Sequence, residues 1–178
     1  VAAACAQRAP GVCLRSLVGE ARAVVSDRQL GEAIDRALGL ADQGAEVLEA
    51  ARVCGTSGFV VHTLAFASFC LARRGDDPMR ALGDAISAGG DADSIAAILG
   101  TWLGALHGES GLPKDLIDRI HDGPFGPSHL RALAARLANR RAGGRDPIPR
   151  YSATAALARN LALYPVILGH GLRRLVPF

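Results

Sequence analysis

Aromatic residues are scarce in this 178-residue chain, and lysine is nearly absent. Only 4% of the residues are Phe, Trp or Tyr, which disfavours a surface that stacks nucleic-acid bases. Lys114 is the single lysine among 20 basic residues; the others are scattered arginines, and the net charge is only +3. A solvated surface explains such mild, dispersed basicity better than a nucleic-acid footprint does. We therefore expect no nucleic-acid partner.

Closely spaced cysteine pairs are also missing. The four cysteines (Cys5, Cys13, Cys54 and Cys70) form no CxxC motif of the kind found in zinc and redox sites. Cys5 and Cys13 are near enough in sequence for a bridge, whereas Cys70 lies in an apolar run like a buried thiol. We interpret all four as reduced, which favours a cytoplasmic protein.

No apolar run is long enough to cross a bilayer. The longest, Phe59–Ala72, is shorter than the roughly 20 residues that a membrane helix needs, and His62 and Thr63 interrupt it. The first residues, Val1–Ala6, contain neither a methionine nor a basic segment and do not resemble a signal peptide. They look like the middle of a helix, so we expect a fragment without its N-terminal portion and without a membrane span.

Helical patterns dominate the sequence, and no segment alternates like a convincing strand. Asp27 and Asp77 precede helical patterns and are suited to cap them. The segment Phe59–Ala72 is apolar on nearly all sides, as in a helix at the centre of a bundle. The sequence therefore predicts an all-α fold, with this segment and Ile95–Leu106 as its most buried parts.

Composition divides the chain into three parts. Residues 1–138 form the predicted helical domain, and residues 139–150, rich in Arg, Gly and Pro, are interpreted as an exposed linker. Residues 151–178 form a C-terminal helical arm that Pro165 kinks or breaks. Arg173 and Arg174 leave a membrane-surface helix open, but packing against the body or a second subunit explains the arm better.

The segment Gly89–Ser94 (GGDADS) is the sharpest local signal in the sequence. It brings the carboxylates of Asp91 and Asp93 and the hydroxyl of Ser94 to the start of an apolar helix. Oxygen ligands at this spacing suit a hard cation such as Mg²⁺ or Mn²⁺. A plain N-cap, with acidic residues near the positive end of the helix dipole, explains the same spacing. Spacing alone leaves both interpretations open.

A second glycine-containing segment, Gly55–Gly58 (GTSG), precedes the most apolar helix. Backbone N–H groups and hydroxyls of this loop are suited to face a phosphate at the helix start. Taken alone, the segment is explained better as an ordinary loop between two helices with a serine cap. His62 and His107 lie in apolar helices and are interpreted as core or edge residues rather than as ligands.

These motifs together carry a resemblance to a known family. In order along the chain, Gly55–Leu64 (GTSGFVVHTL), Gly89–Ser94, Gly104–Gly108 (GALHG) and Leu112–Pro113 resemble the C-terminal half of ADP-ribosylglycohydrolases, which include the hydrolase acting on dinitrogen reductase. The resemblance implies a compact orthogonal all-α bundle, here without its N-terminal half, that holds two Mg²⁺ or Mn²⁺ ions. It also implies cleavage of the glycosidic bond between ADP-ribose and a protein side chain, often arginine.

The resemblance assigns roles residue by residue. Asp91, Asp93 and Ser94 match the C-terminal metal ligands, with serine where many members have threonine, and the two aspartates are also the catalytic candidates that orient water. The matching substrate-binding residues are Thr56, Ser57, Gly58 and Phe59. The glutamate and the Thr-Asp-Asp cluster of the family's N-terminal half do not occur in this sequence. We therefore expect weak metal binding by these residues alone, and a raised pKa for at least one aspartate because like charges repel.

Two functions follow from the resemblance. The first is a hydrolase that removes ADP-ribose from proteins or from an ADP-ribose-containing small molecule. The second is a non-catalytic structural or interaction protein derived from the same family, as jellyfish lens crystallins are. The presence of Asp91, Asp93 and Ser94 in this sequence favours the hydrolase.

Overall fold

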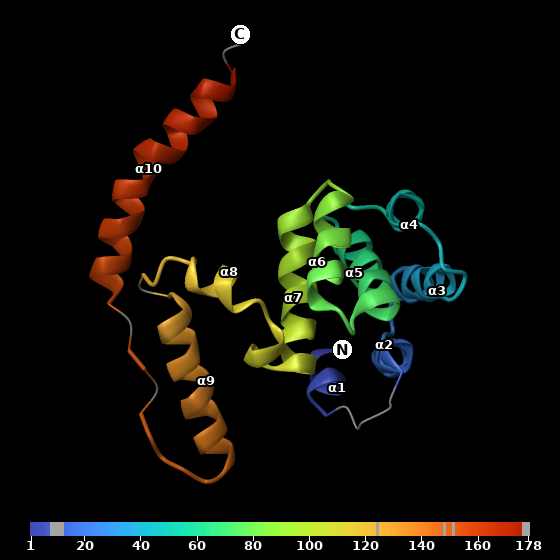
Figure 1. Cartoon of the computed structure of the whole chain (residues 1–178), viewed down its shortest axis with the longest axis horizontal. Coiled ribbons are helices and arrows are strands. Elements are labelled where there is room, and N and C mark those ends of the chain that lie inside the picture. Colours follow the sequence, from blue (N-terminus) through green and yellow to red (C-terminus); the bar gives the residue numbers. More distant parts are fainter. Residues whose placement is uncertain (8–12, 124, 148, 151, 176–178) are drawn as a thin grey trace. The chain divides into compact units, whose positions relative to one another are not determined.

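The computed structural model of the chain describes residues 1–7, 13–123, 125–147, 149–150 and 152–175. These residues fold into helices, and no strand occurs among them, so the predicted all-α fold is confirmed. The elements are α1 (Ala2–Ala6), α2 (Leu14–Ala23), α3 (Arg28–Asp42), α4 (Val47–Cys54), α5 (Val60–Arg74), α6 (Pro78–Ser87), α7 (Ala92–His107), a 3₁₀ turn η1 (Glu109–Gly111), α8 (Lys114–Asp118), α9 (Pro127–Arg141) and α10 (Ala153–Leu175) (Figure 1). The chain separates into two compact units, Val1–Lys114 and Asp115–Phe178.

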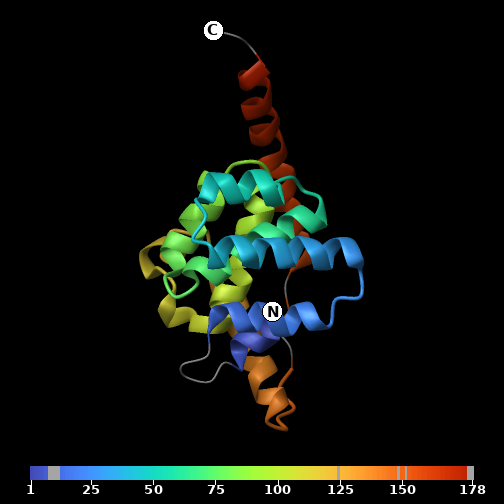
Figure 2. The same ribbon diagram turned by 90° about the vertical axis from the view of Figure 1, so that its right-hand side faces the viewer.

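Helix α5 forms the centre of the first unit. Every residue from Ala65 to Leu71 is buried, including the stacked rings of Phe66 and Phe69, whose centroids lie 5.9 Å apart. Helices α3, α6 and α7 pack against α5 (Figures 1 and 2). Because no side of α5 faces solvent over this stretch, its sequence is apolar all round. Burial of the predicted segment Phe59–Ala72 begins only at Val61, because Phe59 is about half-exposed at the helix start.

Helix α7 buries one face. Ile95, Leu99, Trp102 and Leu103 are buried at helical spacing, and α7 packs with this face against the core formed by α5 and α6. Thr101, on another face, is exposed. The predicted burial of Ile95–Leu106 therefore holds for one stripe of the helix.

Two of the helices begin as the sequence predicts. The Asp27 side chain accepts a hydrogen bond from the backbone N–H of Leu30 (2.8 Å) at the start of α3. The Asp77 side chain does the same for Arg80 (3.1 Å) at the start of α6, with Pro78 as the first helical residue. Each aspartate satisfies one of the N–H groups that a helix start leaves without a partner.

The four cysteines are thiols in the described structure, with no disulfide between them. Cys13 is exposed, whereas Cys5, Cys54 and Cys70 are buried. Burial raises the pKa of Cys54 to about 11 and that of Cys70 to about 12, because a thiolate is poorly solvated there. These two thiols are therefore unreactive core residues.

The second unit includes α9 and α10, whose described side chains are mostly exposed. Arg136 Nη1 and Asn139 Nδ2 both donate to Asp146 Oδ2 (2.7 and 2.6 Å), which ties the segment after α9 back to that helix. Helix α10 continues through Pro165, so the proline does not break it.

The domain boundaries expected at residues 138 and 150 stay predictions. Residue 148 of the expected linker and residues 151 and 176–178 of the expected arm lie outside the described residues. No helix in the described part of the chain is both long and apolar enough to cross a membrane.

Candidate functional site

The loop Gly55–Phe59 connects α4 to α5 and folds back onto the first turn of α5. Gly55 makes this possible, because its φ of +80° belongs to the region that favours glycine. A Cβ at this position would also lie 2.6 Å from Cγ of His62, so the imidazole ring occupies the space that a side chain would need. The loop and the start of α5 are therefore packed as one piece.

Side chains from the first turn of α5 hold the loop in place. The Thr63 hydroxyl lies 3.2 Å from the carbonyl oxygens of both Ser57 and Phe59, to which it donates. The Ser57 hydroxyl lies 2.8 Å from Nδ1 of His62, and the N–H of Phe59 donates to the same hydroxyl (3.3 Å). Both the backbone and the side chain of Ser57 are thus fixed by α5.

The segment that leads into α7 lies directly against this loop. Gly89 and Gly90 both have positive φ (74° and 71°), and the N–H of Asp91 donates to the carbonyl oxygen of Thr56 at 2.7 Å. A Cβ on Gly90 would overlap that carbonyl oxygen, and a Cβ on Gly58 would lie 2.9 Å from Oδ2 of Asp91. The two glycine motifs, distant in sequence, therefore meet at backbone contact, and Thr56 to Gly58 lie on the same side as Asp91.

The N-terminus of α7 is unlike those of α3 and α6. Asp91 occupies the N-cap position, but its side chain makes no capping hydrogen bond. A hydrogen bond with the Asp91 carboxyl group, followed by one from the N–H of Ser94, lowers the pKa of Asp93 below its usual range. Asp93, which is exposed, therefore does not have the raised pKa that was expected for at least one of the two aspartates, because these hydrogen bonds favour its charged form.

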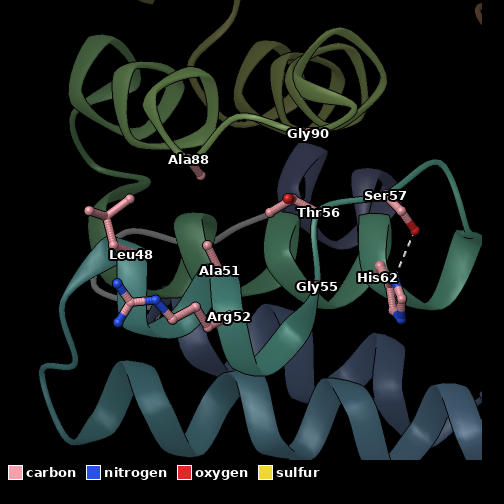
Figure 3. Close-up of a pocket in the computed structure, with 9 residues that line it drawn as sticks. All are labelled: Leu48, Ala51, Arg52, Gly55, Thr56, Ser57, His62, Ala88 and Gly90. Atoms are coloured by element: carbon pink, nitrogen blue, oxygen red, sulfur yellow. Dashed lines mark hydrogen bonds between the residues drawn. The ribbon is translucent and has the colours of Figure 1, made fainter.

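A cavity of about 580 Å³ adjoins the loop (Figure 3). Its walls come from α4, from the loop, from the first turn of α5 and from the segment before α7, through Leu48, Ala51, Arg52, Gly55, Thr56, Ser57, His62, Ala88 and Gly90. The volume is in the range of small-molecule sites. Of the predicted substrate-binding residues, Thr56 and Ser57 line it directly.

Several predicted site residues lie beside this cavity rather than on its wall. Gly58 and Phe59 continue the loop, and Asp91 follows Gly90 of the wall directly. Asp93 and Ser94 are exposed in the first turn of α7. Their assignment as metal ligands, with Asp91, stays a prediction. No group of three or more His, Cys, Asp or Glu side chains able to hold a metal ion occurs in the described part of the chain.

Two polar residues of the cavity wall, Arg52 and His62, are not predicted from the sequence. His62 is an edge residue as expected, but its ring faces the loop and binds Ser57. Its position one helical turn after the loop was the sequence feature that could have predicted a contact between His62 and the loop. The ring of His107 has a hydrogen-bond partner, because its Nε2 lies 2.6 Å from the carbonyl oxygen of Gly75.

Comparison with protein families identifies a match. The family model described as ADP-ribosylglycohydrolase matches residues 1–147 of the 178 in the chain. No curated protein and no solved structure matches the chain. The matched region contains both glycine motifs and the cavity between them. The chain therefore belongs to the ADP-ribosylglycohydrolase family.

Proposed function

We propose that this chain carries the C-terminal part of the active site of a hydrolase that removes ADP-ribose from protein side chains or from ADP-ribose-containing small molecules. Membership of the family supports the reaction class. The observation that carries the proposal for these residues is the Asp91 carboxylate. It stands at a helix start without capping it and lies beside a glycine-rich loop and a cavity.

The capping interpretation of the GGDADS segment is weakened by the other helix starts in the same molecule. Asp27 and Asp77 occupy the same position in α3 and α6, and each accepts a hydrogen bond from the backbone. Asp91 does not, although an aspartate can form this bond readily. Its carboxyl group is therefore not used as a cap and lies beside that of Asp93 instead.

The donor set fits part of a site for a hard divalent cation. Two carboxyl groups, of Asp91 and Asp93, are close enough to hydrogen-bond to each other, and a hydroxyl, of Ser94, follows at once. Oxygen ligands of this kind select Mg²⁺ or Mn²⁺, and a cation would stabilise two neighbouring carboxylates. We propose that these residues hold part of a two-ion site that residues from an N-terminal half complete. Ions bound there would polarise the ribose hydroxyls and a water.

The chain's own residues would then bind and orient the substrate. The Thr56 and Ser57 side chains on the cavity wall would contact ADP-ribose, while Gly58 allows the loop to approach Asp91 closely. Phe59 is 48% exposed, which leaves room for a contact with the substrate. Asp91 or Asp93 would accept a hydrogen bond from the attacking water and so direct it at the anomeric carbon.

The test is a hydrolysis assay on the full-length protein with Mg²⁺ or Mn²⁺. Release of ADP-ribose from arginine-linked and serine-linked substrates is measured for the wild type, Asp93→Asn and the control Asp77→Asn. We expect Asp93→Asn to lower turnover at least about 100-fold, more than the loss of a group that only supports a ligand. Asp77→Asn should leave turnover unchanged.

Equal turnover in the wild type and Asp93→Asn would contradict the assignment of this aspartate. If the wild type released ADP-ribose from neither substrate nor from a free ADP-ribosyl compound, the non-catalytic alternative would replace the hydrolase.

A further inference from the structure

One imidazole ring contacts three residues of the loop beside the cavity. Nδ1 of His62 lies 2.8 Å from the Ser57 hydroxyl, as the dashed line in Figure 3 shows. The ring fills the space where Gly55 has no side chain. It also meets the Phe59 ring edge to face, with centroids 5.3 Å apart and planes at 88°. His62 is therefore the side chain around which this loop is wrapped.

The two polar residues in the first turn of α5, His62 and Thr63, contact different parts of the loop. Thr63 binds the backbone of the loop, through the carbonyl oxygens of Ser57 and Phe59. His62 binds the Ser57 side chain. Without His62, Thr63 would still hold the backbone of the loop, but the Ser57 hydroxyl would keep only the longer bond from the N–H of Phe59 (3.3 Å) and could change rotamer more easily.

The geometry does not suit a serine nucleophile with a histidine base. In such pairs a third group orients the base through its other ring nitrogen. Among the described residues no hydrogen bond to Nε2 of His62 is present, and the Ser57 hydroxyl is engaged by both His62 and the N–H of Phe59. The arrangement fixes a hydroxyl group in one direction, which is a positioning role.

We infer that His62 is a positioning residue: it orients the Ser57 hydroxyl at the cavity wall, so that the loop binds ADP-ribose without first having to be ordered. The inference rests on the proposed function for the ligand, while the positioning itself is a property of the free protein. A polar group held in its binding direction loses less entropy when a ligand arrives. His62 thus acts on the substrate through Ser57.

The test compares four variants of the full-length protein: His62→Ala, His62→Asn, Ser57→Ala and the double variant His62→Ala/Ser57→Ala. The dissociation constant for ADP-ribose is measured by calorimetry. We expect each alanine variant to weaken binding about tenfold, the size of one well-placed hydrogen bond. The double variant should bind ADP-ribose no more weakly than either single variant, because the two substitutions remove the same interaction.

His62→Asn should restore most of the affinity, since the asparagine amide can reach the position of Nδ1. Two controls come from outside the cavity wall: Ser87→Ala on α6 and His170→Ala on α10. Both should bind as the wild type does. A merely structural role of His62 would lower stability in both His62 variants and give no selective rescue by asparagine.

A second readout needs no ligand. The N–H of Phe59 donates to the Ser57 hydroxyl, so its hydrogen-exchange rate reports how well that hydroxyl is held. We expect faster exchange at this amide in His62→Ala and a rate near that of the wild type in His62→Asn. Unchanged exchange in His62→Ala would overturn the inference.

The two readouts separate the two proposals. A wild type that does not bind ADP-ribose would overturn the proposed function, and exchange at Phe59 would still decide whether His62 positions Ser57. A wild type that binds, with His62→Ala binding equally well, would overturn the inference alone.

Discussion

The N-termini of α6 and α7 both have an aspartate at the N-cap position, but the two side chains make different contacts. At α6, Asp77 precedes a proline and its side chain accepts the N–H of Arg80 at 3.1 Å. At α7, Asp91 follows two glycines with positive φ, and its side chain makes no capping bond. The first aspartate satisfies its own helix. The second makes no cap and lies beside Gly58 of the loop before α5 and beside Asp93 of its own helix.

The backbone shows the same difference. The N–H of Asp91 donates to the carbonyl oxygen of Thr56, so the start of α7 is joined to the loop before α5. At the start of α6, the N–H of Asp77 instead donates to the nearby carbonyl oxygen of Arg74. The α7 start is therefore a tertiary contact built around glycines, whereas the α6 start is a local one.

Replacing a glycine by alanine should have opposite effects on the free energy of unfolding at Gly90, before α7, and at Gly83, in α6. Gly90→Ala should lower the free energy of unfolding by about 2 kcal/mol or more, because its φ is strained for alanine and its Cβ would overlap the Thr56 carbonyl oxygen. Gly83→Ala, in the interior of α6, where the new Cβ would meet nothing within 4 Å apart from its chain neighbours and the helix's own backbone, should raise that free energy by about 0.5–1 kcal/mol. Urea denaturation of both variants measures the difference, and equal effects would show that the α7 start tolerates a side chain.

The two aspartates should differ in what they contribute to folding. Asp77→Ala should lower the free energy of unfolding by about 1 kcal/mol because it removes a helix cap, and Asp77→Asn should restore it. Asp91→Ala in metal-free buffer should change it by about 0.5 kcal/mol or less, since no capping bond is lost. The same urea series decides between them. A loss for Asp91→Ala as large as that for Asp77→Ala would mean that Asp91 is a cap.

A side chain at Gly58 should disturb the α7 start without unfolding it. In Gly58→Ala the new Cβ would lie 2.9 Å from Oδ2 of Asp91, and this carboxylate, which is only partly buried, can turn away. We expect a change in unfolding free energy of less than about 0.5 kcal/mol. The displaced carboxylate should still weaken Mn²⁺ binding by the full-length protein about tenfold, by analogy with the loss of a group that orients a ligand. Calorimetric titration checks this, and unchanged affinity would place Asp91 outside the metal site.

Local rules were enough to predict much of the fold. The caps at Asp27 and Asp77 follow from residue type and position, and the burial of α5 follows from a sequence that is apolar on every side. The resemblance rests on both the GTSG loop and the GGDADS segment, and the hydrogen bond from the N–H of Asp91 to the carbonyl oxygen of Thr56 shows that the two segments are in contact.

Tertiary contacts account for what the sequence did not reveal. The bond between His62 and Ser57 depends on the loop turning back at Gly55, and periodicity along α5 carries no information about that turn. Arg52 and Leu48 reach the cavity because α4 lies beside the loop, which its short sequence does not predict. Helix α10 continues through Pro165 although proline usually interrupts the backbone bonds of a helix.

The most direct test of the difference between the two aspartates is a calorimetric Mn²⁺ titration of the full-length protein. The wild type, Asp91→Asn and Asp77→Asn are compared, because asparagine keeps the shape of each side chain and removes its charge. We predict that Asp91→Asn binds Mn²⁺ at least about 100-fold more weakly than the wild type, beyond the loss expected for a supporting group, while Asp77→Asn binds equally well. Equal affinity in Asp91→Asn and the wild type would contradict the account, since Asp91 would then have no part in holding the metal.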